Sequence, residues 1–142
     1  MAILINKDSK VIVLGITGKS GALQTKAMLD AGTDIVAGVT PGKGGQQVHG
    51  VPVYSFVSEA AAEHDFDTAI CFVPPAAAKD SCYEAIDAGV KLIVLTTEEM
   101  ELNDSVEVIE YAHAHGATLV GPGCAGVLAP GECKVGAHPV RF

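Results

Sequence analysis

The residues best suited to chemistry form a glycine-rich segment at positions 15–21, GITGKSG, between an apolar run and a helical pattern. A turn that feeds a helix presents backbone N–H groups and the positive end of the helix dipole to a ligand. An anion, most simply a phosphate, suits such a site. The alternative is a glycine-rich turn that binds nothing.

This segment matches neither of the two common phosphate-binding motifs. The dinucleotide pattern GxGxxG requires glycine where the chain has Ile16, and the P-loop pattern requires glycine where it has Val13. NAD and nucleoside triphosphates are therefore not favoured by the spacing.

A second glycine-rich segment, TPGKGG at positions 40–45, follows the next apolar run. Proteins that bind NAD usually carry an Asp or Glu here, which contacts the adenosine ribose. This chain has Lys43, and a cation suits a phosphorylated ribose, either the 3′-phosphate of CoA or the 2′-phosphate of NADP. A solvated loop lysine is the alternative.

Two further segments follow apolar runs. Residues 73–76 (VPPA) offer rigid apolar surface, and Thr96, Thr97 and Glu98 offer hydroxyls and a carboxylate that could hydrogen-bond a base or ribose. For Thr96, Thr97 and Glu98, capping of a following helix is the alternative.

No catalytic arrangement follows from spacing. His113 and His115 are two positions apart and do not share a helical face. The four cysteines are Cys71, Cys82, Cys124 and Cys133. They show neither a CxxC pair nor a zinc-ligand spacing with histidine, which favours free thiols in a reducing compartment. The alternative is that Cys124 is a thiolate nucleophile.

These segments must be positioned by alternating strands and helices. We expect strands over residues 10–14, 35–39, 51–56, 68–73, 92–95 and 118–120, and helices over residues 20–31, 58–64, 76–88 and 103–115. Ser58 and Asn103 are predicted helix N-caps, and Gly32, Gly89 and Gly116 are placed to end helices.

Near-continuously apolar strands alternating with helices predict an α/β fold. We expect a Rossmann-like, doubly wound fold, with a mainly parallel sheet and helices on both of its faces. Residues 1–142 are predicted to form a single domain. After residue 121, glycine and proline are too dense for a long helix or strand, which predicts an ordered loop region. The apolar ending HPVRF at 138–142 is typical of a cut at a domain boundary.

Composition excludes several classes of partner. The chain has 142 residues, 49% of them hydrophobic, and 9 Lys and Arg against 17 Asp and Glu give a net charge of −8. We expect no nucleic-acid or membrane partner, since there is no basic field and no apolar run of the ~18 residues that span a bilayer. Without a signal-peptide pattern, the expected location is cytoplasmic, or the mitochondrial matrix in a eukaryote.

Several blocks in this order resemble the amino-terminal domain of the α subunit of succinyl-CoA synthetase, the ADP- or GDP-forming succinate–CoA ligase. The most specific are TPGKGG at 40–45 and PGECK at 130–134. The others are ILI at 3–5, GITG at 15–18, GVT at 38–40, GVPV at 50–53, KDS at 79–81, EAIDAG at 84–89, TE at 97–98 and GPGCAG at 121–126.

The resemblance implies that the cofactor is CoA and not NADP. It assigns the CoA contacts to Thr17, Gly18, Lys19, Ser20, Lys43, Thr96, Thr97 and Glu98. In the family, a nucleoside triphosphate phosphorylates a histidine, the phosphoryl group passes to a carboxylic acid, and the CoA thiol displaces phosphate from the acyl phosphate. That histidine belongs to a second α-subunit domain and the ATP-grasp machinery to a β subunit, so this chain is expected to bind CoA without turnover.

Two departures concern the acid. Where succinyl-CoA synthetases usually read GPNCPG, this chain has Gly123 for the asparagine and Ala125 for the second proline. An alanine there is similar to malate–CoA ligases, so succinate, malate and citrate-type acids all stay open. A stand-alone CoA-binding regulatory module and an NADP-dependent enzyme are the alternatives from other classes.

Overall fold

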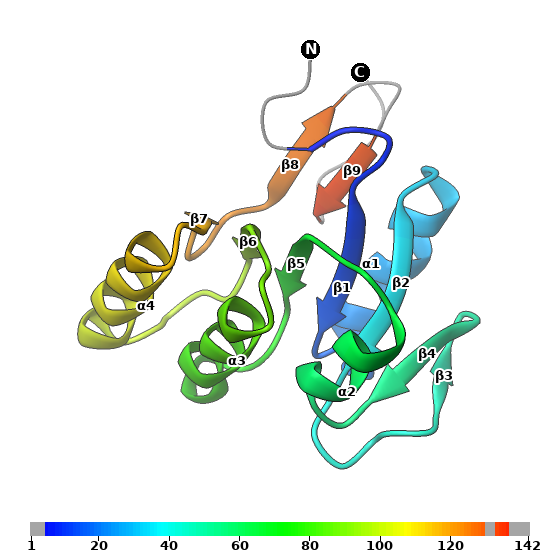
Figure 1. Cartoon of the computed structure of the whole chain (residues 1–142), viewed down its shortest axis with the longest axis horizontal. Coiled ribbons are helices and arrows are strands. Elements are labelled where there is room, and N and C mark those ends of the chain that lie inside the picture. Colours follow the sequence, from blue (N-terminus) through cyan, green and yellow to red (C-terminus); the bar gives the residue numbers. More distant parts are fainter. Residues whose placement is uncertain (1–4, 130–132, 137–142) are drawn as a thin grey trace.

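A twisted seven-stranded sheet organises the computed structural model, which describes residues 5–129 and 133–136 (Figure 1). Its strands, in the spatial order β3-β4-β2-β1-β5-β6-β7, are β3 (Gln47–Val48), β4 (Val51–Tyr54), β2 (Asp34–Val39), β1 (Lys10–Leu14), β5 (Thr68–Cys71), β6 (Leu92–Leu95) and β7 (Thr118–Val120). The helices are α1 (Lys19–Asp30), α2 (Val57–Glu63), α3 (Pro75–Asp87) and α4 (Leu102–Ala114).

The strand order reverses at β1, which lies between β2 and β5. All neighbouring strands from β4 to β7 are parallel, and only the short edge strand β3 is antiparallel to its neighbour. This is the strand order of doubly wound folds, in which ligands bind outside the carboxyl ends of the strands where the order reverses. The predicted fold is confirmed, and the expected ligand position is next to the ends of β1 and β5.

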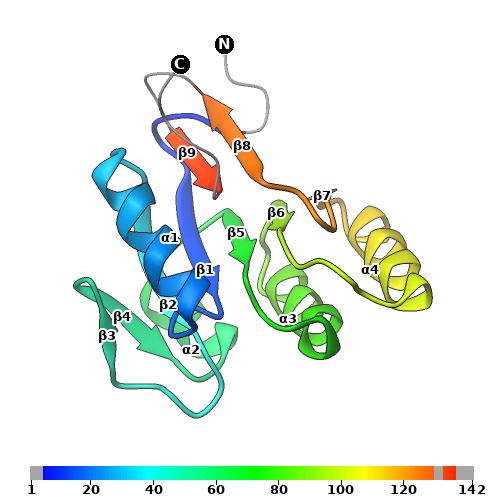
Figure 2. The same ribbon diagram turned by 180° about the vertical axis from the view of Figure 1, so that it is seen from behind.

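Strand β1 shows how the sheet is buried on both faces. Ile12 and Leu14 join the core formed with α2, α3 and α4, whereas Val11 and Val13 join the core on the opposite face, which includes Met28 of α1. All four β1 side chains are 0–1% exposed. Because successive strand residues point to opposite faces, a continuous apolar run is what such a strand requires. Figure 2 shows α1 on its own side of the sheet.

The prediction of a loop region after residue 121 is wrong in part. Residues 126–136 include an antiparallel pair, β8 (Gly126–Ala129) and β9 (Cys133–Gly136), which covers the α1 face of the sheet at the amino ends of the strands (Figures 1 and 2). Cys133 and Val135 enter the core on that face. Gly126 and Gly136 are end residues of these strands, where a glycine weakens the pairing less than it does in a strand interior.

Both predicted N-caps are also wrong, although Gly32, Gly89 and Gly116 do follow helix ends. Helix α2 begins one residue before Ser58, because the Glu59 carboxylate accepts a hydrogen bond of 3.0 Å from the Phe56 N–H. Helix α4 begins at Leu102 with Glu101 in the N-cap position, so Asn103 lies within the helix. The β-strand of 51–56 ends at Tyr54 and that of 68–73 at Cys71.

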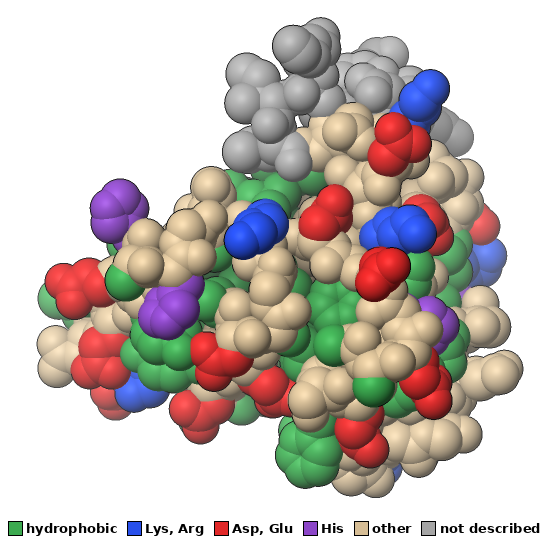
Figure 3. Space-filling model, viewed as in Figure 1, with side chains coloured by type: hydrophobic (Ala, Val, Ile, Leu, Met, Phe, Trp, Pro, Cys, Tyr) green, Lys and Arg blue, Asp and Glu red, His purple; other side chains and the backbone are tan. Residues whose placement is uncertain are grey.

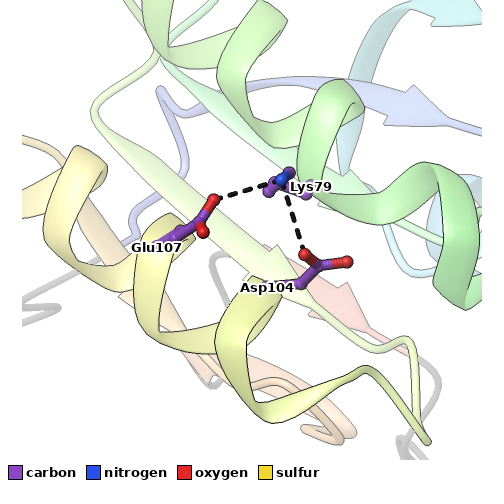
Figure 4. Close-up of polar contacts among 3 residues, drawn as sticks. All are labelled: Lys79, Asp104 and Glu107. Carbon is purple, nitrogen blue, oxygen red and sulfur yellow. Dashed lines mark hydrogen bonds and ion pairs between the residues drawn. The ribbon is translucent and has the colours of Figure 1, made fainter.

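An ion-pair network holds α3 against α4 (Figure 4). The Lys79 Nζ atom lies 3.1 Å from a Glu107 carboxylate oxygen and 3.4 Å from an Asp104 carboxylate oxygen. The hydrogen bond to Glu107 and the charges of both carboxylates raise the pKa of Lys79. The contact joins α3, which follows the loop after β5, to α4.

Candidate ligand site at the carboxyl ends of the strands

Gly15 makes the turn that follows β1. Its N–H donates a hydrogen bond of 2.7 Å to the Val39 carbonyl, and its φ of +80° lies in the left-handed region that favours glycine. A side chain at Gly15 would also place its Cβ 3.1 Å from the Val73 backbone nitrogen and Cγ1. The first turn is therefore packed directly between the end of β2 and the loop after β5.

Gly21, in the first turn of α1, allows the helix to approach β1 closely. A Cβ at this position would lie 2.1 Å from the Gly15 carbonyl oxygen, a distance that no side chain tolerates. The glycines recur as GxxGxxG at 15, 18 and 21, and the third has the role that the third glycine of GxGxxG has in other dinucleotide-binding folds.

The N-terminus of α1 faces the position where the strand order reverses. Gly18 is the N-cap residue, and no side chain of the described residues caps this end of the helix. Lys19 and Ser20 are exposed at the start of α1. Their N–H groups and the helix dipole favour an anion, because the first amides of a helix have no partner within the helix.

When Gly18 and Gly21 are aligned with the second and third glycines of GxGxxG, Ile16 occupies the position of the first glycine, and the structure explains why a large residue fits there. The side chain of Ile16 is fully buried and packs on Gly38 of β2, where a Cβ would lie 2.4 Å from the Ile16 Cγ2 atom. Ile16 thus points into the core and leaves the ligand side of the turn to backbone groups.

This pairing predicts strong coupling between the two positions. Gly38→Ala is expected to lower the free energy of unfolding by about 1–3 kcal/mol, because the added methyl group overfills a closely packed site. In an Ile16→Ala background the same substitution is expected to be neutral or stabilising. Urea unfolding of the two single variants and the double variant measures this coupling, and additive losses would contradict the proposed contact.

Thr17 meets the second glycine-rich loop. Its hydroxyl donates a hydrogen bond of 3.1 Å to the Thr40 Oγ1 atom, and its N–H lies 3.4 Å from the same oxygen. Thr40 follows β2 directly, and its N–H donates to the Tyr54 carbonyl at the end of β4 (3.0 Å). The hydroxyl of Thr17, predicted to contact the cofactor, is thus directed at Thr40 in this structure.

Lys43 is exposed in the loop after β2, and its N–H donates a hydrogen bond of 3.0 Å to the Thr40 carbonyl, which closes a tight turn. The next residue, Gly44, donates its N–H to the Ser55 hydroxyl (3.1 Å). A surface cavity of about 400 Å³ lies beside this loop, with Gly44, Gln46 and Ser55 among its lining residues. The backbone of the loop is therefore held while the Lys43 ammonium stays accessible.

Thr96 and Thr97 lie after β6, and their hydroxyls donate hydrogen bonds to backbone carbonyls at the end of β5 and in the loop that follows it. Thr96 donates to the Cys71 carbonyl (2.6 Å) and the buried Thr97 donates to the Val73 carbonyl (2.7 Å). Each oxygen keeps its acceptor capacity, but its proton is already used. Glu98 is exposed. Helix capping by these residues is excluded, because α4 begins only at Leu102.

A chain of contacts connects these loops. Thr97 holds the Val73 carbonyl, Val73 packs on Gly15, and Thr17 of the same turn meets Thr40 of the Lys43 loop. The site therefore combines backbone donors and the cations of Lys19 and Lys43 on an otherwise acidic molecule. Acidic side chains predominate over α3 and α4 in Figure 3.

Gly21 and Thr40 lie in the two glycine-rich segments, but neither residue was assigned a role of its own from the sequence, and Gly38 lies outside both segments. The GxxGxxG spacing was a visible signal for Gly21, and the contacts of Thr40 and Gly38 had no signal along the chain.

Cys71 and Cys82 are buried together. The pKa of the Cys82 thiol is raised, mainly by its hydrogen bond with Cys71 and next by burial. A buried, protonated thiol is a poor nucleophile.

No helix in the described part of the chain combines the length and apolar character needed to cross a bilayer.

The fold and the glycine-rich first turn define a Rossmann-type nucleotide-binding domain. Residues 6–99 match the model of the CoA binding domain family, and the chain belongs to that family, with coenzyme A as its cofactor.

Curated relatives agree with this assignment. The chain is 49% identical over 141 residues to "Succinate--CoA ligase [ADP-forming] subunit alpha 1" of Archaeoglobus fulgidus, covering 99% of this chain and 48% of that protein. It is 48% identical over 139 residues to the corresponding alpha subunit of Staphylococcus epidermidis, covering 98% of this chain and 46% of that protein. The chain thus spans about half the length of the curated relatives it matches.

Solved structures share the fold. ATP citrate lyase from Methanothrix soehngenii, in complex with citrate and coenzyme A, superposes with a TM-score of 0.81 at 20% identity, over 94% of this chain and 24% of that one. The dinucleotide-forming acetyl-coenzyme A synthetase 1 of Ca. Korarchaeum cryptofilum, in complex with phosphate and ADP, gives a TM-score of 0.82 at 22% identity, over 96% and 30% of the two chains.

Proposed function

We propose that this chain is the CoA-handling part of the α subunit of a two-subunit acid–CoA ligase that resembles succinyl-CoA synthetase. The observation that carries the proposal is the pairing of two anion-favouring elements on adjacent strands. One is the uncapped N-terminus of α1 after β1, and the other is exposed Lys43 after β2. The named alpha subunits at 48–49% identity support the same activity.

CoA carries a pyrophosphate and a ribose 3′-phosphate, and the two elements suit these groups separately. The first turn offers the backbone N–H groups of Lys19 and Ser20 to the pyrophosphate, whereas the Gly18 N–H donates to the Gly15 carbonyl (3.2 Å). Lys43 offers a cation to the 3′-phosphate. At the third segment, the Thr96 and Thr97 oxygens can accept hydrogen bonds, and Glu98 adds a carboxylate that can accept from a base or ribose hydroxyl.

In this proposal CoA supplies the thiol that takes up the acyl group, and this chain's residues bind and orient it. The phosphohistidine lies in a further α-subunit domain, and the nucleotide site lies in an ATP-grasp β subunit. Succinate is the acid that the named relatives favour, with malate and citrate-type acids as the alternatives suggested by Gly123 and Ala125. The cytoplasm is the expected location.

Calorimetric titration of the chain with CoA, dephospho-CoA and NADPH tests the binding role. CoA is expected to bind about tenfold or more tightly than dephospho-CoA, since one charge-assisted contact is worth roughly 1.5–3 kcal/mol. NADPH is expected to bind no better than dephospho-CoA. Preferential binding of NADPH would favour the oxidoreductase alternative, and binding of none of the three would contradict the proposal.

A second measurement separates the ligase from a stand-alone regulatory module. A ligase subunit is expected to form acyl-CoA only when the complete α chain is combined with its β subunit, and the 142-residue chain alone should show no turnover. A complete gene product that ends after Phe142 and finds no β partner would favour the regulatory module.

A further inference from the structure

Thr40 lies at the junction of the two predicted phosphate-binding loops, and each of its polar groups has a different neighbour. Its carbonyl accepts the Lys43 N–H (3.0 Å) and so closes the turn that carries the lysine. Its side-chain oxygen faces both the hydroxyl and the N–H of Thr17, at 3.1 and 3.4 Å. One half-buried residue therefore touches both loops.

The backbone of Thr40 is itself held by the sheet. Its N–H donates to the Tyr54 carbonyl at the end of β4, and the preceding Val39 carbonyl accepts from the Gly15 N–H of the first turn. A residue fixed in this way is a rigid reference point for both loops. The Thr17–Thr40 contact adds a side-chain hydrogen bond to the links that hold the first turn beside the Lys43 loop, namely the Gly15–Val39 backbone bond and the packing of Ile16 on Gly38.

We propose that Thr40 is a positioning residue that sets the spacing between the pyrophosphate-binding turn and the 3′-phosphate-binding Lys43. This inference rests on the proposed function and deepens it. A ligand that carries both phosphate groups needs both loops at a fixed separation, whereas a ligand without the 3′-phosphate needs only the first turn. The Thr17–Thr40 contact should therefore matter more for CoA than for dephospho-CoA.

The test compares Thr40→Val, which keeps the shape but removes the hydroxyl, with Thr40→Ser, which keeps the hydroxyl. Thr40→Val is expected to weaken CoA binding about tenfold and dephospho-CoA binding less than threefold, and Thr40→Ser to bind both like the unaltered chain. Equal losses for the two ligands would overturn positioning in favour of a direct contact. Wild-type affinity of Thr40→Val would overturn it as well.

A double variant separates positioning from general damage. If Thr40 acts by placing Lys43, Thr40→Val combined with Lys43→Ala is expected to bind CoA only slightly more weakly than Lys43→Ala alone. Independent, multiplying losses would overturn the inference. Calorimetry reports affinity per folded molecule through the fitted stoichiometry, so a variant that merely unfolds more easily does not imitate this result.

Hydrogen exchange tests the contact without any ligand. The Thr17 amide is expected to exchange faster in Thr40→Val, whereas the Gly15 amide, bonded to the Val39 carbonyl at 2.7 Å, should be unchanged. If the unaltered chain binds no CoA, the proposed function fails, and the Thr17 exchange rate still decides whether Thr40 holds the first turn. An unchanged Thr17 rate overturns the positioning role by itself.

Discussion

Replacing Gly21 with alanine is expected to lower the free energy of unfolding by about 3 kcal/mol, the upper part of the range for overpacked sites. The added Cβ would lie 2.1 Å from the Gly15 carbonyl oxygen and 3.1 Å from the Ile16 Cα atom. Both are backbone atoms that cannot rotate away, so the start of α1 must move. The expected consequence for binding is a loss of CoA affinity of at least tenfold.

Gly18→Ala is the matched control for stability. It adds the same methyl group in the same turn, but its Cβ would meet the Gly15 oxygen at an ordinary 3.4 Å, and its φ of −68° suits alanine. The expected loss is below ~1 kcal/mol, mainly because alanine is a poorer N-cap than glycine. Equal urea midpoints for the two variants would show that α1 does not depend on the close approach at Gly21.

The second large effect is expected at Lys43. Lys43→Ala should weaken CoA binding by about ten- to a hundredfold and leave dephospho-CoA binding unchanged, because only CoA carries the phosphate that the ammonium contacts. The difference should shrink as ionic strength rises, since Lys43 is exposed and its interactions are screened by salt. Titration of both ligands at two salt concentrations measures this.

Two further variants control for charge and place. Lys43→Arg keeps a cation and should retain most of the preference for CoA. Lys91→Ala removes an equal charge just before β6, at the amino edge of the sheet, and should leave both ligands unaffected. If Lys91→Ala weakens CoA as much as Lys43→Ala does, the effect is one of net charge and the assignment of Lys43 is wrong.

Local patterns along the chain were enough to predict most of the sheet. The apolar runs of β1, β5 and β6 are continuous because both faces of a parallel sheet are buried, and this leaves a clear trace in the sequence. Strands β3, β8 and β9 left no such trace. β3 has two residues, and β8 and β9 have four each between glycines and prolines, so their pairing depends on partners rather than on propensity.

The candidate site shows the same division. That Gly15–Gly21 and Lys43 lie together at one edge followed from the sequence alone, because the carboxyl ends of parallel strands meet there. Their roles as CoA contacts stay predictions. Tertiary structure alone decided that the Thr96 and Thr97 hydroxyls donate hydrogen bonds to the carbonyls of Cys71 and Val73.

Tertiary structure also decided how the unusual first turn works. The sequence determined that residue 16 is isoleucine where many dinucleotide-binding turns have glycine. Only the packing of β1 against β2 places Gly38 beneath that side chain and Thr40 beside Thr17, which are 22 and 23 positions further along the chain. Such contacts leave no local pattern, because neither residue has a partner until the strands pair.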